Sequence, residues 1–116
     1  MVHNICHIEI PVTDIRRAGE FYSKLFGWKI DYDMGNYATF TPGEGLAGGL
    51  DKVEKVTPGG VIFYVAVEDI PKTLKRAEEL GAEMVKEKTE IPNVGWFGLF
   101  SDLDGNIIGI FTSKTE

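Results

Sequence analysis

A repeat is the feature that most limits what this chain can fold into. Residues 8–15 (Ile-Glu-Ile-Pro-Val-Thr-Asp-Ile) align without a gap with residues 63–70 (Phe-Tyr-Val-Ala-Val-Glu-Asp-Ile). Apolar, aspartate and isoleucine positions fall in register. Residues 44–50 (Glu-Gly-Leu-Ala-Gly-Gly-Leu) align in the same way with residues 104–110 (Asp-Gly-Asn-Ile-Ile-Gly-Ile). Correspondence in both halves of the repeat predicts a duplicated structural module.

The length of the chain shows how the two copies must combine. The 116 residues are enough for one ordinary domain, and each copy alone is too small to bury an adequate core. We therefore predict a single domain over residues 1–116. Module one covers about residues 3–51, a connector 52–60, and module two about 61–113.

Composition excludes several classes of function. The net charge of −6 and the mixing of basic with acidic residues leave no positive surface for a nucleic acid backbone. No apolar run reaches the roughly 20 residues that cross a bilayer, and the first ten residues do not resemble a secretion signal. We therefore expect a cytoplasmic protein with neither a nucleic acid nor a membrane partner. The single Cys6 is interpreted as a core residue.

The first copy predicts one strand, one helix and three further strands. Alternating apolar residues predict a strand from His3 to Val12. Asp14 then caps a helix over Ile15 to Phe26, whose apolar residues recur at helical spacing. Gly27 ends that helix. The strands that follow are predicted at Trp28–Tyr32, Tyr37–Thr41 and Leu46–Leu50, and the first two are separated by Met34-Gly35-Asn36.

The second copy predicts the same order. Its first strand contains Phe63, Val65 and Val67, and Asp69 caps a helix that ends at Gly81. The last strands are predicted at Glu83–Lys88, Gly95–Ser101 and Asn106–Thr112. The fold class is thus α+β: two tandem βαβββ modules that form a curved, half-open mixed sheet around a central cleft, with the helices outside.

Strand alternation assigns side chains to the face that the helices leave open. In the first strand Ile8 and Ile10 point to the helix, so His7 and Glu9 point away from it. These two lie about 7 Å apart along the strand, close enough to reach one ligand or one ion. The alternative is that they are polar residues of a solvated sheet face and have no function.

Aromatic and apolar residues are predicted to line the same open face. Tyr37, Ile62, Tyr64 and Phe97 belong to it by alternation. Apolar walls with a few polar groups are typical of a small-molecule pocket. The corresponding residues Phe40 and Phe100 are expected to pack under the helices instead, and Trp96 is compatible with either face.

The chain resembles a known family. The resemblance rests on the double βαβββ pattern, the His-Ile-Glu-Ile-Pro-Val-Thr-Asp opening at residues 7–14, the helix end at residues 21–28 and the Phe-Ser-Asp-Leu-Asp-Gly-Asn sequence at residues 100–106. Together these resemble the vicinal oxygen chelate superfamily of glyoxalase I, extradiol dioxygenases and bleomycin-resistance proteins. The resemblance implies the fold. Isomerisation, oxygenation, thiol transfer and plain drug binding all occur on that scaffold.

The resemblance also implies where a metal ion would be held: by first-strand histidines and last-strand carboxylates. His7 matches one of these four places. The other three carry Ile62, Gly49 and Gly109, whereas a divalent ion needs three or four ligands. We therefore expect no metal cofactor and no dioxygenase activity. The alternative is a divalent ion held by His7, Glu9 and residues of a dimer partner. Gly49 and Gly109 are expected to give a ligand access to the backbone, or else to mark strand bulges.

Two functional hypotheses follow from the resemblance. The first is a metal-independent, glyoxalase-like lyase or isomerase in which His7 or Glu9 moves a proton on a small, carbonyl-bearing substrate. The second is a protein of the bleomycin-resistance type that only binds or sequesters a hydrophobic or aromatic compound. A small-molecule ligand and a homodimer are expected in both.

Overall fold

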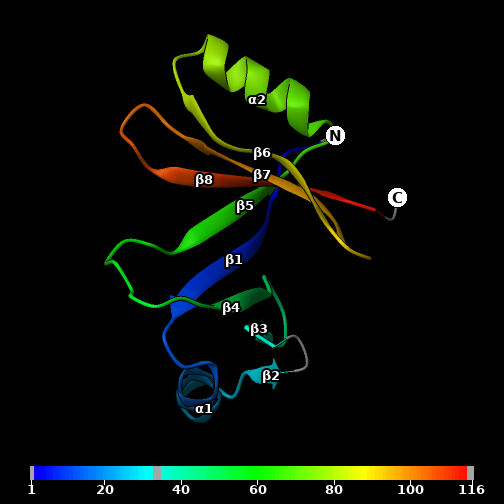
Figure 1. The fold of residues 1–116 in the computed structure, drawn as a ribbon. Helices are drawn as coiled ribbons and strands as arrows, with labels where there is room; N and C mark the ends of the chain where they lie inside the picture. The colour runs from blue at the N-terminus through cyan, green and yellow to red at the C-terminus, as the bar shows by residue number, and fades with distance from the viewer. Residues whose placement is uncertain (1, 33–34, 115–116) are drawn as a thin grey trace. The chain divides into compact units, whose positions relative to one another are not determined.

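The computed structural model describes residues 2–32 and 35–114, and it confirms the α+β class (Figure 1). The chain divides into two compact units: an N-terminal unit, Cys6–Ile62, and a C-terminal unit, Phe63–Glu116 with Met1–Ile5. The elements in chain order are β1 (Ile5–Val12), α1 (Ile15–Phe26), β2 (Lys29–Asp31), β3 (Tyr37–Thr41), β4 (Gly48–Lys52), β5 (Ile62–Ala66), α2 (Ile70–Glu79), β6 (Glu83–Ile91), β7 (Gly95–Ser101) and β8 (Ile107–Ser113).

In the N-terminal unit, helix α1 packs on one face of a mixed sheet with the strand order β2-β3-β4-β1. Strand β1 runs parallel to β4, whereas β3 is antiparallel to both β4 and β2. The parallel pair is possible because the chain crosses over through α1 and two further strands before it returns beside β1.

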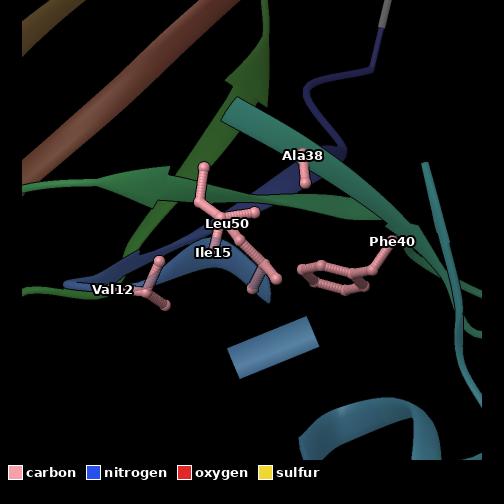
Figure 2. Close-up of a cluster of buried hydrophobic side chains, with 5 residues drawn as sticks. All are labelled: Val12, Ile15, Ala38, Phe40 and Leu50. Atoms are coloured by element: carbon pink, nitrogen blue, oxygen red, sulfur yellow. The ribbon is translucent and has the colours of Figure 1, made fainter. Parts of the chain in front are cut away.

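Local sequence fixes the ends of α1. The Asp14 side chain accepts a hydrogen bond from the backbone N–H of Arg17 at 3.0 Å, which satisfies one donor that the first turn leaves open. At the other end Gly27 adopts φ 75°, a left-handed conformation that costs glycine little. The helix spans exactly the predicted residues. Its buried side packs into a core made of Val12, Ile15, Ala38, Phe40 and Leu50 (Figure 2).

The C-terminal unit has the strand order β5-β8-β7-β6, with β5 parallel to β8 and the other pairs antiparallel. Asp69 caps α2 through the N–H of Lys72 at 3.0 Å. The core of this unit consists of Val67, Ile70, Leu74 and Ile110. Among the described residues, no helix has the length and apolar character needed to cross a membrane.

Several strand boundaries differ from the sequence prediction. Strand β4 begins at Gly48 rather than Leu46, because its pairing with β1 starts at the Ile8–Gly48 pair and the side chain of Leu46 is exposed. Strand β6 continues to Ile91, three residues beyond the prediction. This edge strand is largely exposed on both faces and carries register shifts, so it lacks the alternation that marks a strand in sequence. Met34, part of a predicted turn, lies outside the described residues.

The contribution of the Asp14 cap to stability can be tested by mutation. Replacing Asp14 by Ala removes the acceptor for the Arg17 N–H, and we expect the free energy of unfolding to fall by about 0.5–2 kcal/mol. Asp14→Asn keeps an acceptor oxygen and should cost much less. Urea denaturation followed by circular dichroism measures both. Equal losses for the Ala and Asn variants would show that the cap contributes nothing beyond charge.

Candidate functional site

The N-terminal unit has a face of polar residues opposite α1. Register assigns it: Glu9 and Thr39 both pair with Gly49, and Tyr37 pairs with Asp51. Paired residues point to the same side of a sheet, and alternation adds His7. We call this set the polar face: His7, Glu9, Tyr37, Thr39, Gly49 and Asp51. The residues between them, among them Ile10, Phe40 and Leu50, pack on the α1 side, which was predicted for Ile10 and Phe40.

A hydrogen bond joins His7 to Tyr37. Nε2 of His7 lies 2.8 Å from the Tyr37 hydroxyl oxygen, and the two rings are nearly parallel, with an interplanar angle of 15°. Burial lowers the pKa of His7 below its ordinary value of 6.5, because the charged imidazolium loses solvation. The imidazole is therefore neutral near pH 7. A neutral imidazole beside a hydroxyl group can exchange protons with a bound molecule.

Two carboxylates share this face. Glu9 is half-buried on β1, and its Cα is paired with that of Gly49 on the neighbouring strand. Asp51 is half-buried on β4, and burial raises the pKa of its carboxyl group above the ordinary value. The polar face thus carries a neutral base, a hydroxyl group and two carboxylic acids on one side of the sheet, and a hydrogen bond joins the base, His7, to the hydroxyl group of Tyr37.

Tyrosine rings cover both glycines that were expected to leave room at the backbone. A Cβ atom added to Gly49 would overlap the hydroxyl and ring of Tyr37, and one added to Gly109 would overlap the ring of Tyr64. The expected open space at the backbone is therefore filled, in each unit, by a tyrosine side chain of the same unit. Direct ligand contact at the two glycines stays a prediction.

The corresponding face of the C-terminal unit is apolar. Tyr64 pairs with Gly109, and Phe97 pairs with Phe111 on the same strand β8, so all four point to the side opposite α2. The rings of Tyr64 and Phe97 meet edge to face, with centroids 6.4 Å apart. We call this the aromatic face.

The structure also gives the positions of the other residues that the sequence analysis singled out. Trp96, which the sequence left open, packs against the core on the α2 side, as does Phe100. Ile62 is half-buried at the start of β5. Burial raises the pKa of the Cys6 thiol, which favours its protonated form.

A groove of about 450 Å³ lies between α1 and the segment that contains β2. Trp28, Ile30 and Tyr32 line it together with residues of the helix. None of the predicted site residues lines this groove, so it is separate from the polar face.

Comparison with known proteins identifies the family. The model of the Glyoxalase/Bleomycin resistance protein/Dioxygenase superfamily matches residues 4–110. The chain belongs to this superfamily. A glyoxylase-like domain-containing protein of Didymella fabae is 35% identical, over 93% of this chain and 92% of that protein. The fosfomycin resistance protein FosX of Listeria monocytogenes is 22% identical, over 100% of this chain and 94% of that protein.

A solved structure gives the same result for the fold. A superfamily member from Vibrio splendidus 12B01 superposes with a TM-score of 0.72, at 18% identity, over 97% of this chain and all of that one. At this identity the likeness supports the fold alone. The resemblance stated from the sequence is thereby confirmed at the level of the superfamily.

The residues of the present chain do not fit the metal site that the family resemblance implies. His7 is present, but Ile62 has no ligand atom, and the rings of Tyr37 and Tyr64 occupy the space that side chains on Gly49 and Gly109 would need. Within residues 2–32 and 35–114, no three His, Cys, Asp or Glu residues are grouped so that they could hold an ion. Apart from His7, the ligands of a metal ion would have to come from residues other than those at the family's ligand places.

Two features of the polar face were missed in the sequence. Tyr37 was placed on the correct face, but its bond to His7 depends on how far a tyrosine on β3 reaches across β4. Asp51 was also overlooked, although its position two residues after Gly49 puts it on the same side of a strand.

The lowered pKa of His7 predicts how stability depends on pH. In the unfolded chain His7 takes up a proton near pH 6.5, whereas in the folded protein it does so only at lower pH. Folded protein should therefore lose stability as the pH falls below about 6.5, because the unfolded state binds more protons.

Urea denaturation between pH 8 and pH 5 measures this effect, with His7→Gln as the control. The variant retains Glu9 and Asp51, whose titration then cancels in the difference between the two proteins. We expect wild type to lose more stability than the variant over this range. Parallel pH profiles would contradict a burial-lowered pKa at His7.

Proposed function

We propose that this chain is a glyoxalase-like enzyme of the lyase or isomerase type that binds a small, partly hydrophobic carbonyl compound and moves a proton on it without a metal ion. His7 or Glu9 carries the proton. The observation that supports this most directly is the 2.8 Å hydrogen bond between the neutral imidazole of His7 and the Tyr37 hydroxyl. Neither group is needed for the core, which lies on the other side of the sheet.

The electrostatics of His7 suit proton transfer. A general base has to be unprotonated at the working pH, and the lowered pKa of His7 provides that form, although it also weakens the basicity of the imidazole. Partial burial also strengthens hydrogen bonds to a ligand, because less water competes for them. Glu9 on the same strand face offers a carboxyl group as a second candidate.

The aromatic face supports the hydrophobic part of the proposal. The half-buried Phe97 and Phe111 offer apolar ring surface beside the buried Tyr64, and rings of this kind bind hydrophobic or aromatic groups. The single cleft expected from the sequence stays a prediction.

The second candidate is a protein that binds or sequesters a compound without transforming it. The similarity to a fosfomycin resistance protein over the whole chain favours it. On this hypothesis the His7–Tyr37 pair is a hydrogen-bonding element of the binding surface and has no catalytic role. Turnover distinguishes the two candidates.

The His7→Ala variant tests the proposal. A ligand is first selected by thermal-shift screening of aromatic and carbonyl compounds, and turnover and affinity are then measured on it. We expect the rate to fall by about 10²–10⁴-fold with little change in affinity, because a proton-transfer group has been removed. His3→Ala is the matched control, since His3 is exposed and its ring bonds only to the carbonyl of Ala66 among the contacts described. A wild-type protein that binds the ligand without turnover would favour sequestration.

Elemental analysis tests the metal-independent part. Because Gly49, Ile62 and Gly109 stand at the expected ligand places, we predict well under one equivalent of zinc, nickel, iron or manganese per purified chain. Activity should survive dialysis against a chelator. One equivalent of metal that disappears in His7→Ala would contradict the proposal.

A further inference from the structure

The contact between Tyr37 and Gly49 decides where the Tyr37 hydroxyl lies. Tyr37 comes from β3 and reaches across β4 to His7 on β1. Its ring crosses β4 directly over Gly49, in the volume that a Cβ atom would fill. A residue with any side chain at position 49 would push the hydroxyl away from His7. The bond therefore depends on glycine at this position.

Glu9 lies on β1, the neighbour of β4 on the side opposite to β3. Its Cα is paired with that of Gly49, and adjacent strands are about 4.8 Å apart. Since Glu9 and Gly49 point to the same face, the carboxylate and the Tyr37 hydroxyl belong to one small area of the polar face. A base and a hydroxyl group are thus placed beside each other.

We propose that Tyr37 is a catalytic residue that donates a proton to the carbonyl oxygen of the substrate, that Glu9 takes the proton from the adjacent carbon, and that Gly49 is the positioning residue that lets Tyr37 reach His7. This inference rests on the proposed function and narrows it to carbonyl compounds that form an enol. His7 acts by holding the Tyr37 oxygen at 2.8 Å.

The proton transfer balances without any further reactant. The C–H bond next to the carbonyl breaks, its proton goes to the Glu9 carboxylate, and its electron pair moves toward the carbonyl oxygen. The O–H bond of Tyr37 breaks, and its proton forms the O–H bond of the enol. The electron pair left on the phenolate oxygen is stabilised by a hydrogen bond from His7 Nε2–H. The reverse steps return a proton to carbon, which isomerises or epimerises the substrate.

NMR of the His7 ring tests the positioning role without any ligand. In ¹⁵N-labelled protein, Gly49→Ala should change the chemical shift of His7 Nε2, because the displaced Tyr37 ring no longer keeps its hydroxyl at hydrogen-bond distance from this atom. Tyr37→Phe should do the same. The two carboxylates of the polar face, Glu9 and Asp51, and the exposed Asp31 on the neighbouring edge strand β2 are unchanged in both variants.

The double variant separates positioning from general disturbance. In Tyr37→Phe the hydroxyl is already lost, so adding Gly49→Ala should hardly change the His7 signals further, even though the ring must still move. The effect of Gly49→Ala on the free energy of unfolding should persist in the double variant. Additive changes in the Nε2 chemical shift would overturn the role of Gly49.

Exchange of carbon-bound hydrogen in 2-hydroxyacetophenone tests the chemistry. This aryl ketone has hydrogens next to its carbonyl, and ¹H NMR in D₂O follows their replacement. We expect wild-type protein to accelerate exchange, and Tyr37→Phe, Gly49→Ala and Glu9→Gln each to lower the catalysed rate by about 10²–10⁴-fold.

The outcomes separate the two proposals. If wild type catalyses exchange and Tyr37→Phe does so equally well, the role of Tyr37 is overturned while the proposed function stands. If wild type does not accelerate exchange, both the proposed enolisation and the role of Tyr37 are overturned. The His7 signals then still report whether Gly49 positions the hydroxyl.

Discussion

Two consecutive glycines in the central strand β4 set the arrangement of the N-terminal unit. A Cβ on Gly48 would overlap the Phe40 ring and the carbonyl of Ile8, whereas a Cβ on Gly49 would overlap Tyr37. Neighbouring residues of a strand point to opposite faces, so each face accepts one aromatic ring from β3 across a position without a side chain. Phe40 closes the core on one side (Figure 2), and Tyr37 reaches the polar face on the other.

This packing explains why chemistry and stability are separated in so small a unit. The residues that exclude water, among them Phe40 and Leu50, lie on the α1 side, whereas the titratable groups lie on the opposite side and are only partly buried. Partial burial is enough to keep His7 neutral, yet it leaves the group accessible. A fully buried histidine would be equally neutral and could not meet a ligand.

Sequence could predict elements and faces, because both depend on local periodicity. Alternation correctly assigned Tyr37 and Phe40 to opposite faces, and the Asp14 and Gly27 signals gave the exact bounds of α1. It could not predict the His7–Tyr37 bond, which depends on the order in which strands pair and on ring reach across a third strand. It also took glycine for open space, since a single residue type does not reveal what packs against it.

The two units share one packing arrangement but differ in the residues around it. In each, a tyrosine ring lies over a glycine of a strand in the middle of its sheet, Tyr37 over Gly49 and Tyr64 over Gly109. Tyr37 ends at a histidine on a face with two carboxylates, whereas Tyr64 meets the edge of Phe97 on an apolar face. A sheet face that carries charge needs solvent or a polar partner, and an apolar face needs cover, so the two faces favour chemically different partners. The two units thus share one way of packing a tyrosine on a glycine while the side chains around it differ, and for this reason the reaction has to be inferred from individual residues rather than from the fold.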